Sequence, residues 1–294
     1  MKRVATVGEA MIELSLQGGM AQVGVAGDSL NTAIYLKRSA PDIAVDYVTC
    51  LGDDPFSDQI EEFIASQSIG TNQCTRIANK SPGLYAITTT EDGERSFTYW
   101  RSASAARDVF KSGHGYDFSP LAAYDLVYLS GISVAILPQP ARLALLQWLS
   151  DTPVRLAYDS NYRPRLWEDT KTARQITESF WQRADICLPS IDDEMALFDE
   201  RAEDVVARFQ RYESVGALKR GSDGPLSLGS QVHQTYAPAP RVVDTTAAGD
   251  SFNGGYLAAI LSGRSQAEAL LCGHACAARV VQFRGAIIPD EATP

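Results

Sequence analysis

The sequence predicts an α/β fold built on a mostly parallel central sheet. Short apolar runs alternate along the chain with amphipathic segments of helical length, as strand–helix–strand units produce. Of the 294 residues, 45% are hydrophobic and 21% are charged, which is ordinary for a globular protein with a substantial core. No repeat, low-complexity tract or proline-rich linker divides the chain, so we expect a single domain over residues 1–294.

Six apolar runs of strand length form the predicted central sheet, at residues 4–7, 45–49, 126–129, 156–158, 186–188 and 216–218. Amphipathic segments lie between and after them, at residues 29–38, 58–67, 140–149, 170–183, 202–212, 249–261 and 265–283. In such sheets ligands bind beyond the carboxyl ends of the strands, so the loops at that edge are the candidate site.

Two regions interrupt the alternation and are typical of β-hairpins. Residues 11–16 and 22–25 flank Gly18-Gly19, while residues 84–90 and 95–101 flank Asp92-Gly93. We interpret these strands, contributed by about residues 11–25 and 84–101, as a small β-sheet that covers the site as a lid. An apolar lid face could also pair with a second subunit, so a homo-oligomer stays an open alternative.

The charge balance argues against polyanionic partners. The 36 acidic residues exceed the 26 basic ones, and the net charge of −10 repels nucleic acid and anionic membranes. The N-terminus lacks the apolar stretch of a signal peptide and no run approaches about 18 apolar residues, so we expect a cytoplasmic protein. Five scattered cysteines favour free thiols over disulfides or a metal centre.

The most informative segment is Asp244-Thr-Thr-Ala-Ala-Gly-Asp-Ser-Phe-Asn-Gly-Gly, residues 244–255. Its small residues open a predicted helix whose first N–H groups have no partners within the helix, so an anion can approach them. Asp250 lies at this junction, and its carboxylate is suited to accept the proton of a hydroxyl group during phosphoryl transfer to an alcohol. The alternative is an aspartate that merely caps an ordinary helix.

Two further segments offer groups for a sugar. Gly27 would let a ligand approach the backbone, and Asp28 and Asn31 suit sugar hydroxyls, although Asp28 could instead cap the following helix. In the lid, Tyr99 and Arg101 face the same side of a strand, with Tyr85 on the neighbouring hairpin strand. A ring beside a guanidinium suits a sugar acid, because arginine binds a carboxylate through two hydrogen bonds; the alternative is a surface pair.

Two loops that follow predicted strands supply candidates for phosphate or nucleotide binding. The first contains Asn161 and Arg163, which could contact phosphates or the substrate. The second suits a loop that curls around a nucleotide, although its Ser-Asp-Gly is also a common turn, and it contains Lys219, Gly221, Ser222 and Gly224. The phosphate loop Gly-x-x-x-x-Gly-Lys-Ser/Thr does not occur, so a kinase would have to bind phosphate at a helix N-terminus instead. The dinucleotide turn Gly-x-Gly-x-x-Gly does not occur near a first strand either, so a dehydrogenase is not expected.

These segments in this order resemble the ribokinase/PfkB family of carbohydrate kinases. Residues 244–252 match the family signature Asp-Thr-x-Gly-Ala-Gly-Asp-Ser/Ala-Phe, and the resemblance runs from residues 6–14 to residues 283–289. It implies a ribokinase-like three-layer α/β/α sandwich with a small β-sheet lid. Several segments look most like members that use ATP to phosphorylate the terminal hydroxyl of 2-dehydro-3-deoxy-D-gluconate: residues 27–33, 82–85, 93–101, 129–133 and 161–167.

The resemblance also implies roles for the candidate residues. Asp250 would be the catalytic base, and the anion hole would be formed by Ala247, Ala248 and Gly249. The residues that would surround the substrate are Gly27, Asp28, Asn31, Tyr85, Tyr99, Arg101 and Arg163. Those that would hold ATP, which carries Mg²⁺, are Asn161, Arg163, Lys219, Gly221, Ser222, Gly224, Ala247 and Gly249.

Two positions depart from the family pattern. Ala247 replaces the first signature glycine, and we expect a right-handed backbone there, which tolerates the added methyl group. In the Asn-x-x-Glu motif, which the family ties to magnesium, Ile191 replaces the asparagine and Glu194 is retained, so we expect an indirect role for Glu194 in magnesium binding. Two alternatives stay open: a kinase of a neutral ketose such as fructose, and a non-catalytic sugar-binding protein.

Overall fold

The computed structural model describes residues 2–17, 20–89 and 95–293, so the predicted turns Gly18-Gly19 and Asp92-Gly93, together with Thr90, lie outside the described residues. The central sheet consists of β1 (Arg3–Val7), β4 (Ala44–Leu51), β5 (Gly70–Arg76), β10 (Leu126–Ser130), β11 (Arg155–Asp159), β12 (Ile186–Leu188), β13 (Val215–Leu218) and β14 (Leu226–Leu228). Its eight strands follow the order β14-β13-β12-β11-β10-β1-β4-β5, and β14 alone among them runs antiparallel to its neighbour.

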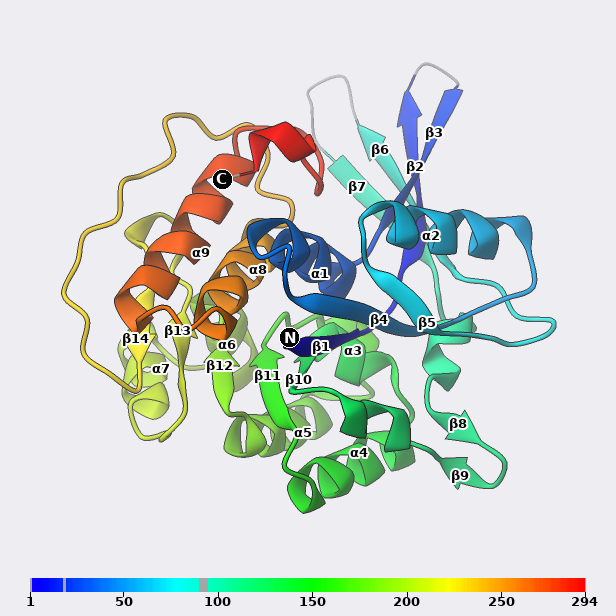
Figure 1. The fold of residues 1–294 in the computed structure, drawn as a ribbon, viewed down its shortest axis with the longest axis horizontal. Coiled ribbons are helices and arrows are strands. Elements are labelled where there is room, and N and C mark those ends of the chain that lie inside the picture. The colour runs from blue at the N-terminus through cyan, green and yellow to red at the C-terminus, as the bar shows by residue number, and fades with distance from the viewer. Residues whose placement is uncertain (1, 18–19, 90–94, 294) are drawn as a thin grey trace.

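Helices cover both faces of this sheet (Figure 1). One face carries α1 (Asp28–Ser39), α2 (Pro55–Ser66), α8 (Ala248–Leu261) and α9 (Gln266–Val280). The other carries α3 (Gly131–Ile136), α4 (Gln139–Asp151), α5 (Thr170–Arg183), α6 (Ile191–Phe198) and α7 (Ala202–Phe209). The predicted α/β/α sandwich is confirmed.

The apolar residues of β10 show how the two layers arise. Side chains alternate along a strand, so Leu126 and Tyr128 enter the core beneath α1 and α8. Val127 and Leu129 enter the core beneath α4 and α5. Because both faces are covered, the strand is buried along its whole length and reads as a continuous apolar run.

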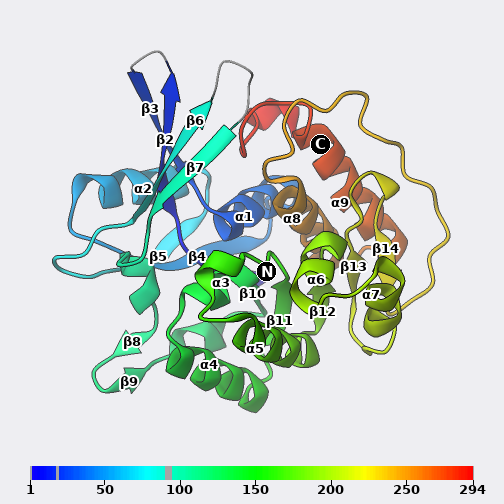
Figure 2. The same ribbon diagram turned by 180° about the vertical axis from the view of Figure 1, so that it is seen from behind.

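The second sheet consists of β2 (Met11–Gln17), β3 (Met20–Ala26), β6 (Gly83–Thr89) and β7 (Arg95–Trp100), in the order β3-β2-β6-β7. It projects outward beside α2, on the half of the molecule that contains β4 and β5, in both views (Figures 1 and 2). Shorter elements are β8 (Lys111–Ser112), β9 (Gly115–Tyr116) and the 3₁₀ turns Ala105–Asp108, Ser119–Ala123, Pro164–Leu166, Gly221–Asp223 and Asp290–Ala292. Among the described residues, no helix has the length and apolar character needed to cross a bilayer.

Candidate active site

The carboxyl ends of the central strands and the second sheet border one large cavity of about 1710 Å³. This volume exceeds that of a pocket for a single small ligand, so two ligands can lie side by side. Most of the residues predicted from the sequence line this cavity: Gly27, Asp28, Asn31, Tyr85, Tyr99, Arg101, Asn161, Arg163, Lys219, Gly221, Ser222, Ala247, Ala248, Gly249 and Asp250.

The N-terminus of α8 faces the cavity, which Ala248, Gly249 and Asp250 line, although Ala248 N donates a hydrogen bond of 3.2 Å to Thr245 O. Ala247 is the N-cap, and no side chain caps this helix end, so Asp250 is not a capping aspartate. Asn31 Nδ2 donates a hydrogen bond of 2.9 Å to Asp250 Oδ2. Burial and the negative charge of Asp28 raise the pKa of Asp250 to about 8, although the Asn31 hydrogen bond and the Lys219 charge oppose the rise.

Ala247 has φ 60° and ψ 16°, which is the left-handed region. The expected right-handed backbone at this position is therefore wrong. The chain must turn sharply at residue 247 to lead into α8, because Ser251 N already bonds Ala247 O at 2.8 Å as the first helical contact. The family's glycine would adopt this conformation freely, whereas alanine adopts it under strain.

Asp28 is held by the last residue of β10 and by the loop after β11. Ser130 Oγ donates to Asp28 Oδ2, and Asn161 Nδ2 donates to the same oxygen at 3.0 Å. No side chain caps α1, so Asp28 does not act as a helix cap. Burial raises the pKa of Asp28. Gly27 has a packing reason of its own, since a Cβ at this position would lie 2.4 Å from Glu9 O.

In the second sheet, Tyr85 and Tyr99 stack with ring centroids 5.5 Å apart. Arg101 forms an ion pair with Glu9, a partner that sequence reasoning missed. The Arg101 side chain is 10% exposed and that of Glu9 is 0% exposed, so the pair is buried at the base of the sheet. The position of Glu9 just beyond β1 was the available signal, because that edge of the sheet borders the site.

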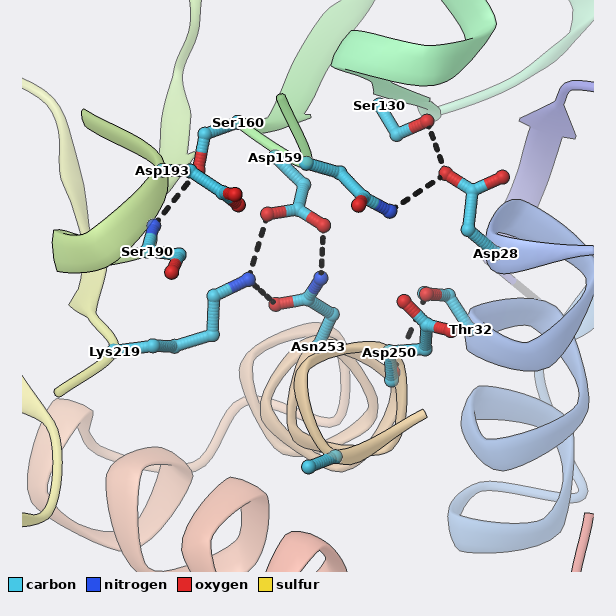
Figure 3. Close-up of polar contacts among 12 residues, drawn as sticks. Asp28, Thr32, Ser130, Asp159, Ser160, Ser190, Asp193, Lys219, Asp250 and Asn253 are labelled. Carbon is cyan, nitrogen blue, oxygen red and sulfur yellow. Dashed lines mark hydrogen bonds and ion pairs between the residues drawn. The ribbon is translucent and has the colours of Figure 1, made fainter. Parts of the chain in front are cut away.

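A second buried network lies beside α8 (Figure 3). Lys219 Nζ donates to Asp159 Oδ1 at 2.6 Å and to Asn253 Oδ1 at 3.0 Å. Asn253 Nδ2 donates in turn to Asp159 Oδ2 at 3.0 Å. Sequence reasoning placed Lys219 in a nucleotide loop but missed Asn253, whose position inside the helix gave no signal.

Three of the predicted site residues have a less direct relation to the cavity. Gly224 does not line the cavity, and its φ of 74° explains the glycine. Arg163 lines the cavity, yet its guanidinium is half-exposed and lies 3.3 Å from Asp193. Glu194 is fully buried away from the cavity, with Arg208 at 2.8 Å and Trp181 Nε1 at 3.2 Å.

Burial raises the pKa of Glu194 to about 7 even though Arg208 opposes the rise. Its indirect role in magnesium binding stays a prediction. Within the described part of the chain, no three histidine, cysteine, aspartate or glutamate side chains group closely enough to hold a metal ion.

Comparison with known proteins identifies the class. Residues 1–293 match the family model "pfkB family carbohydrate kinase", so the chain belongs to the pfkB family of carbohydrate kinases, as the resemblance indicated. The 2-dehydro-3-deoxygluconokinase of Escherichia coli (strain K12) is 41% identical over 307 aligned positions, covering 100% of this chain and 99% of the relative. That of Dickeya dadantii (strain 3937) is 42% identical over 308 positions, with the same coverage of both.

Solved structures share the fold. The PfkB protein from Polaromonas sp. JS666 superposes with a TM-score of 0.81 at 25% identity, covering 96% of each chain. The aminoimidazole riboside kinase from Salmonella enterica, solved with aminoimidazole riboside and an ATP analog, also has a TM-score of 0.81, at 22% identity over 100% of this chain and 96% of that one. The predicted ribokinase-like fold, with its large and small sheets, is confirmed.

Proposed function

We propose that the protein is an ATP-dependent kinase of 2-dehydro-3-deoxy-D-gluconate, acting on the terminal C6 hydroxyl to give 2-dehydro-3-deoxy-6-phosphogluconate. The observation that carries this proposal is the half-buried Asp250 carboxylate at the N-terminus of α8, in a cavity that also contains Arg101. The substrate is supported by two relatives with the name 2-dehydro-3-deoxygluconokinase, which are 41% and 42% identical over the whole chain.

The reaction needs a base and a site for developing negative charge. Asp250 takes the proton of the C6 hydroxyl, whose oxygen forms a bond to the γ-phosphorus while the bond to the β–γ bridging oxygen breaks and ADP leaves. A pKa raised to about 8 suits a base that works near neutral pH. The N–H groups of residues 247–250 stabilise the phosphoryl oxygens.

The cavity has room and suitable walls for both substrates. Its α9 side is apolar and suits a purine ring, with Pro225, Val242, Ala278 and Val281 among the lining residues. At the other end Tyr99 and Arg101 suit a sugar acid, the ring by covering apolar faces and the guanidinium by pairing with the carboxylate. Mg²⁺ delivered with ATP, a cytoplasmic location and a homo-oligomeric state stay predictions.

An assay coupled to ADP release tests the proposal, with MgATP and, in turn, 2-dehydro-3-deoxygluconate, fructose and ribose. We expect turnover with the sugar acid and kcat/KM at least 100-fold lower with either neutral sugar. Turnover confined to a neutral sugar would favour the ketose kinase. Absence of turnover with all three would favour a non-catalytic sugar-binding protein.

Arg101→Ala tests the recognition of the carboxylate. We expect KM for the sugar acid to rise more than 10-fold while KM for ATP changes less than about 3-fold, because the lost interaction is worth about 1.5–3 kcal/mol. The ATP value measured on the same preparation is the control for folding, and Glu9→Gln, which breaks the buried ion pair but keeps the guanidinium, is the control for the orientation of the small sheet. Equal changes in both KM values would contradict a carboxylate-binding role.

A further inference from the structure

We infer that Lys219 is a catalytic residue whose ammonium contacts the phosphoryl group in transfer, and that Asp159 and Asn253 are the positioning residues that hold it there. This inference rests on the proposed kinase reaction and goes beyond the expectation that residues 219–224 form a nucleotide loop. Neither Asp159 nor Asn253 belongs to the predicted site.

The Lys219 ammonium is held at one point by elements from three parts of the chain. Asp159 ends β11, Lys219 follows β13, and Asn253 lies in the second turn of α8 (Figure 3). The Lys219 side chain is 11% exposed, Asp159 is 4% exposed, and Asn253 is fully buried. An ammonium has three N–H donors, and two of them bond Asp159 Oδ1 and Asn253 Oδ1.

Asn253 helps to hold the Lys219 ammonium in one position. Its carbonyl oxygen accepts from Lys219, while its amide nitrogen donates both to Asp159 Oδ2 and to Tyr128 OH, at 3.0 and 3.1 Å. Tyr128 OH also accepts from Thr32 Oγ1 at 3.2 Å. Because every member has a partner, the lysine cannot rotate away without breaking a buried hydrogen bond.

The held ammonium lies next to the anion hole. A Cβ built on Gly249 would be 3.8 Å from Lys219 Nζ, so the glycine leaves open space between the α8 N–H groups and the lysine. Lys219 and Gly249 line the same cavity. An anion seated on the α8 N-terminus would therefore meet the third donor of Lys219.

A purely structural role explains these observations less well. If the pair served only to join β11 and β13 across β12, apolar side chains of similar volume would do so at lower cost, because buried ion pairs lose their hydration. Instead, the Lys219 side chain is 11% exposed and lines the cavity. In phosphoryl transfer, negative charge spreads over the equatorial oxygens, so a fixed cation stabilises the transition state more than the bound substrates. Lys219 exchanges no proton in this step.

Two variants test the inference on intact protein: Lys219→Met, and Lys219→Met combined with Asp159→Asn. The double variant removes both charges, so no unpaired carboxylate is buried. We expect kcat to fall at least 100-fold in both, with KM for the sugar changed less than about 3-fold. Lys171→Met, at an exposed position on α5, is the control and should keep kcat within about 2-fold.

A second measurement is the thermal stabilisation given by ADP with aluminium fluoride and the sugar, which imitates the transferred phosphoryl group. Both Lys219 variants should lose most of this increment in Tm while keeping the increment given by ADP alone. Recovery of kcat in the double variant to within 10-fold of the wild type would overturn the inference in favour of a structural ion pair. Wild-type protein that turns over none of the sugars would overturn the proposed function, and the inference with it.

Discussion

Ala247 holds a backbone conformation that glycine adopts freely and alanine does not. Its φ of 60° places the Cβ close to the following carbonyl oxygen, at a cost of about 1–2 kcal/mol. The turn needs this conformation because it brings the chain into α8 with the first N–H groups directed at the cavity. Strain is thus retained at the proposed anion hole, as backbone strain often is at functional sites.

Ala247→Gly should relieve this strain. The gain is partly offset by the greater backbone freedom of glycine in the unfolded chain, which costs about 0.5–1 kcal/mol. The matched control is Ala248→Gly, one residue further on within α8, where glycine brings only the cost. We expect Ala247→Gly to be about 1–2 kcal/mol more stable than the control in urea unfolding. Equal losses of stability in the two variants would contradict the strain.

The sequence predicted site residues that belong to short local motifs, including Asn31 and Asp250, but it did not identify the partners Glu9 and Asn253. The segment 244–252 carries its chemistry locally, because a helix N-terminus and an adjacent carboxylate are properties of consecutive residues. Glu9 lies 92 positions from Arg101, and Asn253 lies 34 positions from Lys219. No local pattern reports such pairs. Only the sheet order, which brings the strand ends together, shows them as partners.

At the scale of elements, the buried pair of Glu9 and Arg101 joins the small sheet to the central one. Glu9 follows β1 and Arg101 follows β7, so the pair lies where the small sheet leaves the central sheet. A buried ion pair contributes little net stability, but removing one partner leaves the other charge buried and alone. The orientation of the small sheet therefore depends on both residues.

Glu9→Gln should be strongly destabilising, by about 3–5 kcal/mol in urea unfolding, because Arg101 loses its counter-charge. Glu9→Gln combined with Arg101→Met should recover much of that loss, since no unpaired charge remains buried. The control is Asp204→Asn, which removes a fully exposed ion pair with Arg201 and should change stability little. If the two losses simply add in the double variant, the residues do not act as a pair.

The strand β5 was missed by sequence analysis because it has no clear apolar signal. The strand β5 reads Gly-Thr-Asn-Gln-Cys-Thr-Arg and lies at the edge of the sheet, where only part of its surface packs. The helix α2 begins at Pro55, three residues before the predicted start, because Asp54 caps it through Phe56 N and Ser57 N. Strands buried on both faces were identified, since continuous apolar runs need no tertiary information.

For the whole molecule, the buried acids make stability depend on pH in an unusual direction. Burial raises the pKa of Asp250, Asp28 and Glu194. The native state therefore keeps protons that the unfolded chain releases, and the free energy of unfolding falls as pH rises between about 4 and about 8. Surface carboxylates such as Asp125, whose pKa is lowered by hydrogen bonding to Arg3 N, act the other way and lose their contribution as pH falls below about 4.

Asp250→Asn should separate catalysis from stability. The variant lacks the proposed base. It also lacks the carboxyl group that stays protonated in the native state above its ordinary pKa of 3.8. We expect kcat to fall by roughly 10²–10⁴-fold. In ligand-free thermal unfolding, Tm of the variant should exceed that of the wild type at pH 8, and the difference should shrink towards pH 5.

The exposed Asp125→Asn is the matched control. Its lowered pKa gives a small loss of Tm that is nearly constant over the same pH range, because Asp125 is ionised in both states there. A Tm difference for Asp250→Asn that stays flat from pH 5 to pH 8 would mean that Asp250 titrates normally in the native protein. Its burial would then carry no cost, and the carboxylate would be fully ionised at neutral pH before any substrate binds. The two pH series therefore decide whether this fold gives up stability to keep a poised base at the N-terminus of α8.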